Sequence, residues 1–219
     1  MQPSKLSPAE IAQASFTLIR SRLQAEGHTF TGTHAAILER VIHSTADFDF
    51  VHLLRLSPGA VDAGVAALQQ GCPVIADVNM VRVGISATRL GAHGGAVHCF
   101  VAEPETRLLA TAAGITRSAA AIRSAGERGL LQGALVAIGN APTAVLEILR
   151  LVETGCRPAL VIGVPVGFVG TVESKAALMA QNAVPWIVTT GYKGGSSVAV
   201  AIVNALLRLA AGATAEEID

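Results

Sequence analysis

Cysteine is scarce in this 219-residue sequence, and its three cysteines are unevenly spaced. Cys72, Cys99 and Cys156 include no Cys-x-x-Cys pair, and the six histidines show no His-Glu-x-x-His or comparable spacing. Protein zinc sites and redox-active dithiols depend on such spacings. We therefore expect no metal site built from protein ligands, and cysteines that pack as small apolar side chains in a reducing cytosol.

Charge is sparse as well. Charged residues make up 15% of the sequence and the formal net charge is zero, so the basic surplus that binds nucleic-acid phosphates is missing. Hydrophobic residues, in contrast, make up 51%. Such an apolar excess predicts that part of the surface is buried against a second copy of the chain, in a homodimer.

Long apolar runs are absent too. No run reaches the ~18 residues that a membrane-spanning helix requires. Residues 1–8 are mostly polar and include a single lysine, unlike a secretory signal peptide. We therefore expect a cytoplasmic protein without a membrane partner.

The motifs of several common enzyme classes are missing. Gly163, Gly167 and Gly170 follow the order G-x-x-x-G-x-x-G, not the G-x-G-x-x-G that lets a dinucleotide pyrophosphate approach the backbone. The sequence also contains no Walker A motif and no G-x-S-x-G nucleophile elbow. Nucleotide-dependent and serine-hydrolase chemistry therefore have little support.

A recurring local plan is present instead. Apolar runs that end at 138, 163 and 189 each meet a glycine-rich turn, which a helical pattern follows. This layout points backbone N–H groups at an anionic ligand, so it predicts a large anionic small molecule. Glycine-rich turns also serve purely structural roles, and this alternative stays open.

Apolar runs and helical segments alternate along most of the chain, which is typical of a mainly parallel sheet with helices on both faces. We expect a three-layer α/β/α fold that forms a single domain over residues 1–219. Ligands of such folds bind beyond the carboxyl ends of the strands, where the glycine-rich turns would lie. The expected strands cover 53–56, 73–76, 97–101, 134–138, 159–162 and 186–189.

Local signals mark the first helices. Ser7-Pro8-Ala9-Glu10 is a capping box with Pro at the first helical position, and it predicts a helix through Leu23. The apolar spacing predicts a second helix over 33–44. Ser57-Pro58 predicts the cap of a third helix, which runs to about Gln70.

Candidate site residues cluster in three places. Arg40 and His43 lie three residues apart and share a helix face, and His43 is either catalytic or a helix-terminal cap. Thr116-Arg117-Ser118 opens an alanine-rich helix as an N-cap or as an anion clamp, and propensity favours the cap. Asp77 follows an apolar strand and is equally a cap or the edge of a site.

Taken together, these segments resemble the precorrin-8X methylmutase family of cobalamin biosynthesis, which includes the cobalt-precorrin-8 methylmutases. The resemblance covers nearly the whole chain and depends on the ordered set of motifs. The matching motifs are Ser15-Phe16 with Ile19-Arg20, Glu39-Arg40-Val41-Ile42-His43, Asp77-Val78-Asn79-Met80-Val81, Thr116-Arg117-Ser118-Ala119-Ala120, Ile138-Gly139-Asn140-Ala141-Pro142-Thr143-Ala144, Pro165-Val166-Gly167-Phe168-Val169-Gly170 with Glu173-Ser174-Lys175, and Lys193-Gly194-Gly195-Ser196.

The resemblance implies an isomerase that moves a methyl group from carbon 11 to carbon 12 of a corrin-ring precursor, a formal 1,5-sigmatropic shift without a redox cofactor. It implies that His43 is catalytic and donates a proton to a ring nitrogen. It also implies substrate contacts through Ser15 and Arg40, and a homodimer with its cavity near the subunit interface. The carboxylates of a corrinoid suit arginine, so we include the Thr116-Arg117-Ser118 segment among the substrate-binding residues.

Two positions depart from the family's pattern. Family members often carry Gly before Asp47, where this chain has Ala46. Many also carry a basic residue at the position of Tyr192, so this chain lacks a cation for a substrate carboxylate there. Neither departure involves His43.

Two other functions stay open from the residues alone. A phosphate-ligand transferase could use the same helix N-termini, and protection against heat by a nucleotide would favour it. A non-catalytic tetrapyrrole carrier would bind the ring without changing it, and tight product binding without turnover would favour that function.

Overall fold

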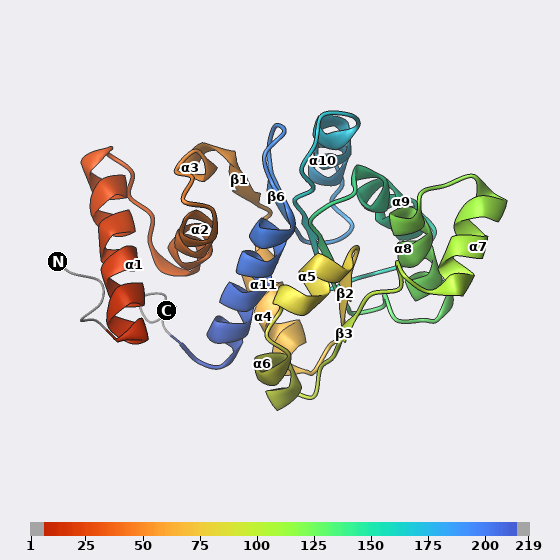
Figure 1. The fold of residues 1–219 in the computed structure, drawn as a ribbon, viewed down its shortest axis with the longest axis horizontal. Coiled ribbons are helices and arrows are strands. Elements are labelled where there is room, and N and C mark those ends of the chain that lie inside the picture. The colour runs from red at the N-terminus through yellow and green to blue at the C-terminus, as the bar shows by residue number, and fades with distance from the viewer. Residues whose placement is uncertain (1–6, 214–219) are drawn as a thin grey trace.

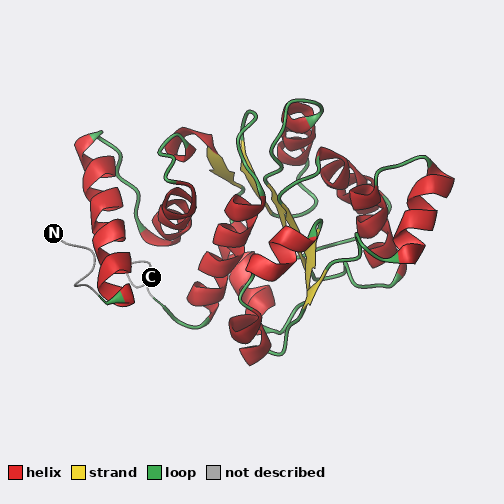
Figure 2. Ribbon diagram, viewed as in Figure 1, coloured by secondary structure: helices red, strands yellow, loops and turns green. Residues whose placement is uncertain are grey.

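A computed structural model describes residues 7–213. Within them, six strands form one sheet in the order β1-β6-β5-β4-β2-β3, and helices pack on both faces (Figures 1 and 2). This arrangement confirms the expected three-layer α/β/α fold. None of the helices in this range is both long enough and apolar enough to span a bilayer.

The strands are β1 (Leu54–Leu56), β2 (Val74–Ala76), β3 (Val97–His98), β4 (Leu135–Ile138), β5 (Leu160–Gly163) and β6 (Trp186–Thr189). The helices are α1 (Pro8–Ala25), α2 (Gly32–Thr45), α3 (Phe50–Leu53), α4 (Ala60–Gln69), α5 (Asn79–Gly84), α6 (Ala87–Ala92), α7 (Pro104–Ala113), α8 (Arg117–Glu127), α9 (Pro142–Glu153), α10 (Thr171–Ala180) and α11 (Ser196–Ala210). Each strand occurs where an apolar run predicted it, although β3 is shorter than expected and ends at His98. The predicted second helix is α2.

The sheet is parallel except at one edge strand. Strands β2 to β6 pair in parallel, whereas β1 runs antiparallel to β6, with Leu54 opposite Thr189. The amino end of β1 therefore lies beside the carboxyl ends of the other strands. This side of the sheet, which we call the carboxyl edge, carries the turns after β2, β4, β5 and β6 and the segment that leads into β1. The three glycine-rich turns lie there, as expected.

Side chains of each strand alternate between two apolar cores, because successive residues of a strand point to opposite faces. On one face, Leu135 and Ala137 pack with side chains of α2, α4 and α11. On the other face, Val136 and Ile138 pack with side chains of α8, α9 and α10. Helices α2 and α8 therefore lie on opposite sides of the sheet, at the left and the right of Figure 1.

The predicted helix cap is correct for α1 and wrong for α4. The Ser7 hydroxyl accepts a hydrogen bond from the Glu10 N–H (3.3 Å), and the Glu10 carboxylate accepts one from the Ser7 N–H (2.7 Å), which confirms the capping box. Helix α4 begins only after Gly59, which has a left-handed conformation. The prediction that Ser57 caps this helix is wrong, because its hydroxyl accepts a hydrogen bond from the Trp186 N–H at 2.9 Å.

Candidate functional site

The carboxyl edge has a switch point between β4 and β2. Strands β5 and β6 follow β4 in one direction along the sheet, whereas β2 and β3 lie on its other side. In open α/β sheets, ligands bind in the crevice that opens at such a point. A cavity of about 480 Å³ lies here. Its lining comes from the segments that follow β2, β3 and β4 and from the starts of α8 and α9: Val78, Val101, Thr116, Arg117, Ser118, Asn140, Ala141, Pro142 and Thr143.

Thr116, Arg117 and Ser118 line this cavity at the start of α8, the segment for which the sequence left an N-cap and an anion clamp open. Thr116 is the N-cap, because its hydroxyl accepts a hydrogen bond from the Ala119 N–H (3.2 Å). The same hydroxyl lies 2.7 Å from that of Thr143 and so ties the start of α8 to the start of α9. Arg117 is exposed, and no carboxylate within residues 7–213 forms an ion pair with it. Its guanidinium can therefore bind a ligand carboxylate.

Asp77 follows β2 and holds the turn after β4. Its side chain is fully buried, and its oxygens accept hydrogen bonds from the N–H groups of Gly139 (3.1 Å), Asn140 (2.8 Å) and Ala141 (2.9 Å). Burial raises the pKa of the Asp77 carboxyl, and these three hydrogen bonds oppose that shift. The expectation that this turn offers its N–H groups to an anionic ligand is wrong, because a carboxylate of the protein already binds them.

Glycines at the carboxyl edge allow the turns to pack closely. A Cβ atom on Gly139 would lie 2.7 Å from the Cα atom of Ser196, and one on Gly194 would overlap the carbonyl oxygen of Val164. Both neighbours are backbone atoms, so a larger residue would push the turns apart. At these two positions the structural alternative explains the glycine.

His43 and Arg40 lie together against Phe16 of α1. The imidazole stacks on the Phe16 ring, with the ring centres 4.7 Å apart and the planes 10° from parallel. The guanidinium carbon of Arg40 lies 5.5 Å from the centre of the same ring. Phe16 is buried and His43 is exposed, so the phenyl ring orients the imidazole while solvent still reaches it.

Ser15 precedes Phe16 on α1 and is half-buried. Its hydroxyl donates a hydrogen bond to the carbonyl oxygen of Ile11 at 2.8 Å. A hydroxyl that donates in this way keeps its lone pairs for accepting a hydrogen bond. Ser15 therefore offers an acceptor to a ligand in this conformation.

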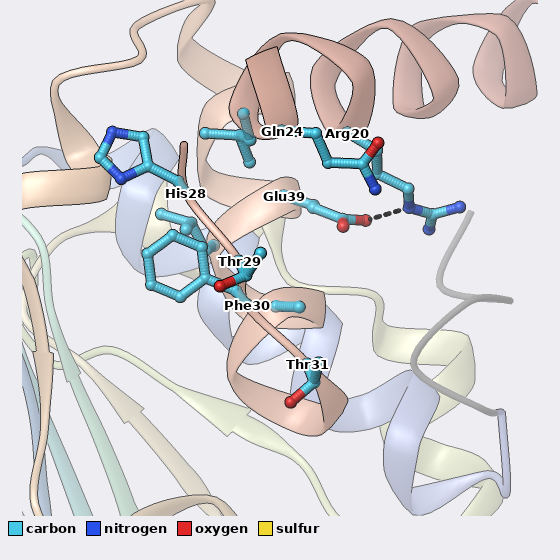
Figure 3. A pocket seen from close by; sticks show the side chains of 10 residues that line it. Arg20, Gln24, His28, Thr29, Phe30, Thr31 and Glu39 are labelled. Carbon is cyan, nitrogen blue, oxygen red and sulfur yellow. Dashed lines mark hydrogen bonds and ion pairs between the residues drawn. The ribbon is translucent and has the colours of Figure 1, made fainter. Parts of the chain in front are cut away.

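A small pocket of about 170 Å³ lies between α1 and α2 (Figure 3). Arg20 and Glu39 face each other there, with the Arg20 Nε atom 2.9 Å from a carboxylate oxygen of Glu39. The volume is below the ~300 Å³ of typical small-molecule sites. We interpret the ion pair as a contact that holds α1 to α2, which keeps Phe16 beside His43.

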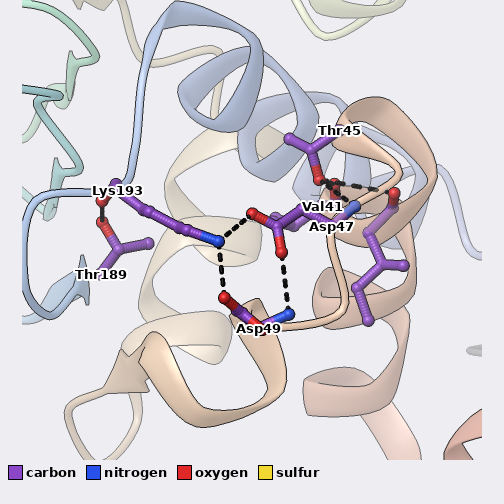
Figure 4. Close-up of polar contacts among 7 residues, drawn as sticks. Val41, Thr45, Asp47, Asp49, Thr189 and Lys193 are labelled. Atoms are coloured by element: carbon purple, nitrogen blue, oxygen red, sulfur yellow. Dashed lines mark hydrogen bonds and ion pairs between the residues drawn. The ribbon is translucent and has the colours of Figure 1, made fainter.

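Lys193 connects the turn after β6 to the segment after α2 (Figure 4). Its Nζ atom donates hydrogen bonds to the carboxylates of Asp47 and Asp49, each at 2.6 Å. The hydrogen bond from Lys193 lowers the pKa of Asp47, and the two carboxylates raise the pKa of Lys193. Sequence reasoning missed this contact, because only the antiparallel placement of β1 brings the two segments together.

Cysteines and potential metal ligands form no further candidate site in the part of the chain that the structure describes. Cys72, Cys99 and Cys156 are free and half-buried, so they are less buried than expected, and burial raises the pKa of each thiol. Within residues 7–213, no three His, Cys, Asp or Glu side chains lie together in a way that could hold a metal ion.

The candidate residues form two groups within one chain. Ser15, Arg40 and His43 belong to α1 and α2, on one side of the sheet, whereas the Thr116–Ser118 segment belongs to α8, on the other side. Both groups border the carboxyl edge, because α2 ends at the segment that contacts Lys193 and α8 begins at the switch-point cavity.

Known proteins match this chain along most of its length. A family model described as precorrin-8X methylmutase matches residues 10–209. The cobalt-precorrin-8 methylmutase of Leptospira interrogans is 40% identical over 205 residues, which cover 91% of this chain and 92% of that protein. The precorrin-8X methylmutase of Pseudomonas aeruginosa is 42% identical over 198 residues, which cover 90% and 93%. The crystal structure of precorrin-8X methyl mutase from Thermus thermophilus has a TM-score of 0.85 and 44% identity, and the match covers 93% of this chain and 97% of that one. The resemblance seen in the motifs is confirmed: the chain belongs to the precorrin-8X methylmutase family.

Proposed function

We propose that this chain is an isomerase of cobalamin biosynthesis that moves a methyl group from carbon 11 to carbon 12 of precorrin-8X or cobalt-precorrin-8, giving hydrogenobyrinate or cobyrinate. The observation that carries the proposal is the family match over residues 10–209, together with relatives that are named for each of the two substrates. The reaction rearranges one molecule, so it consumes no second substrate. It requires a proton donor and a surface that binds a ring with many carboxylates.

His43 is the proposed proton donor. Its exposed imidazole is held in one plane by Phe16, and it lies in the last turn of α2, at the carboxyl edge. A proton on a ring nitrogen makes the corrin precursor electron-poor, which eases migration of the methyl group. Arg40 and His43 both lie against the Phe16 ring, so a substrate carboxylate bound to Arg40 would lie near the proposed proton donor.

The carboxylates of the ring are the proposed ligands of Arg40 and Arg117, with Ser15, Thr116 and Ser118 as hydrogen-bonding neighbours. Strands lie about 4.8 Å apart, so the carboxyl edge from β6 to β2 spans about 14 Å. A macrocycle that lies along this edge could therefore reach both groups of residues. Alternatively, two subunits could each supply one group to a shared cavity.

A homodimer belongs to the same proposal, and exposed apolar side chains at the carboxyl edge support it. Phe168 and Val169 follow β5 and are 84% and 91% exposed, and the Phe168 ring lies 5.5 Å from that of Tyr192. A second copy that covers this surface would close the substrate cavity at the interface. Stable dimers typically bury more than ~1,200 Å² in total.

Light scattering tests the homodimer. The wild-type chain should have twice the mass of 22.4 kDa, and Phe168→Asp should shift it toward one copy. Leu108→Asp, which changes another exposed apolar side chain, on α7, should leave the dimer intact. A single-copy mass for the wild type at micromolar concentration would contradict this part of the proposal. Cytoplasmic location, as expected from the sequence, completes the proposal and is tested by cell fractionation.

His43→Ala tests the reaction. Methyl migration restores conjugation, so wild-type protein mixed with precorrin-8X or cobalt-precorrin-8 should change the absorption spectrum. General acid catalysis is worth about 10²–10⁴ in rate, so His43→Ala should lose that factor and still bind product. His52→Ala, which removes an exposed histidine of α3, is the matched control and should turn over normally. Tight product binding by a wild type that never turns over would instead indicate a carrier.

A further inference from the structure

Lys175 of α10 is a buried cation without an acidic partner. Its side chain is 1% exposed, and no carboxylate within residues 7–213 forms an ion pair with it. Its Nζ atom instead donates hydrogen bonds to the backbone carbonyl oxygens of Gly191 (3.1 Å) and Lys193 (2.8 Å). Burial of an ammonium group is unfavourable unless its surroundings compensate. These two carbonyl groups belong to one turn, the turn after β6.

The turn after β6 is held at several further points. The Thr189 hydroxyl donates a second hydrogen bond to the Lys193 carbonyl oxygen (2.9 Å). The N–H of Gly195 donates to the carbonyl oxygen of Val164 (2.8 Å). The backbone carbonyl group of Lys193 therefore accepts hydrogen bonds from two side chains, the Lys175 ammonium group and the Thr189 hydroxyl at the end of β6.

The side chain of Lys193 carries this constraint across the carboxyl edge. Its Nζ atom binds the carboxylates of Asp47 and Asp49, which follow α2 (Figure 4). Asp47 lies four residues after His43, immediately beyond Ala46, which ends the helix. A continuous chain of hydrogen bonds and one short turn thus joins α10 to the end of α2.

We propose that Lys175 is a positioning residue for the methyl transfer: by holding the Gly191 and Lys193 carbonyl groups, it places the Lys193 ammonium where it fixes the end of α2 and the His43 imidazole. The inference rests on the proposed function, in which His43 donates the proton. Lys175 itself touches no substrate, because the turn after β6 covers its ammonium group. Its effect reaches the reaction only through Lys193.

Kinetics of Lys175→Met test this role against a merely structural one. Small displacements of a catalytic group can cost about 10²-fold in rate, so we expect kcat to fall about 10- to 100-fold with KM nearly unchanged. Leu178→Ala is the control, because it removes a fully buried apolar side chain from the same helix. The Leu178 side chain packs in the apolar core and not against the turn after β6. It should lower the melting temperature and leave kcat within about threefold of wild type. The same result for Lys175→Met would overturn the inference.

A second variant keeps the test independent of folding. Lys193→Met removes the contact with Asp47 and Asp49 while Lys175 stays in place. If Lys175 acts only through Lys193, the two substitutions together should lower kcat no further than Lys193→Met alone, because Lys175→Met then has no remaining contact to disturb. Multiplied effects on kcat would show that Lys175 does not act through Lys193, and would refute the proposal.

Hydrogen exchange separates this inference from the proposed function. Lys175→Met should accelerate amide exchange both in 190–195 and in 46–50, whereas Leu178→Ala should not. Faster exchange confined to 190–195 would refute the coupling to the end of α2. If the wild type never turns over either methylmutase substrate, the proposed function fails, and the exchange measurement alone decides whether Lys175 holds the end of α2.

Discussion

Replacement of Asp77 should test how the turn at the switch point is held. Its buried carboxylate accepts three backbone hydrogen bonds, two at one oxygen and one at the other. Asp77→Ala leaves three N–H donors without an acceptor, two of them buried and that of Asn140 part-buried. Each buried donor costs about 1–3 kcal/mol, which gives about 2–6 kcal/mol for the pair and a smaller addition for Asn140. Burial already disfavours the carboxylate, as its raised pKa indicates, so its removal offsets part of this cost. We therefore expect a loss of about 3–5 kcal/mol in the free energy of unfolding.

Asp77→Asn separates hydrogen bonding from charge. The amide oxygen can take the place of the oxygen that accepts from Asn140 and Ala141, and only the Gly139 N–H then faces an amide NH₂ group. One lost hydrogen bond predicts a cost of about 1–3 kcal/mol, clearly smaller than that of alanine. Asp62→Asn, at an exposed carboxylate in the first turn of α4, is the control and should cost less than about 1 kcal/mol.

Urea denaturation of the three variants measures these differences, provided that the m-value stays constant. The reasoning predicts the order alanine, asparagine, control, from the largest loss to the smallest. An Asp77→Ala variant that loses less than about 1 kcal/mol would show that other groups satisfy the three N–H donors. Equal losses for alanine and asparagine would show that the charge of Asp77, not its hydrogen bonds, stabilises the turn.

Two further predictions concern single residues. Ala46 has φ 54° at the left-handed end of α2, so Ala46→Gly should stabilise the protein by about 0.5–1 kcal/mol in thermal or urea unfolding, whereas Ala63→Gly inside α4 should destabilise it by a similar amount. Equal signs for the two variants would contradict this. Burial lowers the pKa of Lys175 from 10.5 to about 8, so the unfolded chain binds more protons than the folded protein between these pH values. The free energy of unfolding of the wild type should therefore rise from pH 8 to 10.5 relative to that of Lys175→Met. The comparison with this variant removes the contribution of the thiols, which titrate in both proteins. A flat difference would show that Lys175 titrates normally.

Much of the fold could be predicted because the signals are local. Short apolar runs separated by helical patterns are enough to indicate a parallel sheet covered on both faces. Local signals do not predict the direction of β1, because the pairing of Leu54 with Thr189 depends on residues that are distant in sequence. The same limit explains the wrong helix cap at Ser57, whose hydroxyl binds the N–H of Trp186 instead of the start of α4.

The candidate site also combines features that local sequence patterns predict with contacts that they do not predict. The spacing of Arg40 and His43 predicts their shared helix face, and the structure places both against Phe16. No local pattern indicates that Asp77 binds the turn after β4, or that Lys193 reaches Asp47. Both contacts join segments that meet only once the sheet has formed, so sequence spacing carries no signal for them.

Two buried charges of opposite sign shape the carboxyl edge. Asp77 accepts hydrogen bonds from the N–H groups of the turn after β4, and Lys175 donates hydrogen bonds to carbonyl groups of the turn after β6. Within residues 7–213, neither is paired with an opposite charge, so each is compensated by backbone dipoles that it also holds in place. Turns held in this way need no ligand to order them, and a ligand that binds there loses less free energy to ordering the protein. A site that must hold a proton donor at one fixed atom of a large ring depends on such order, because the rate falls steeply when the donor is displaced.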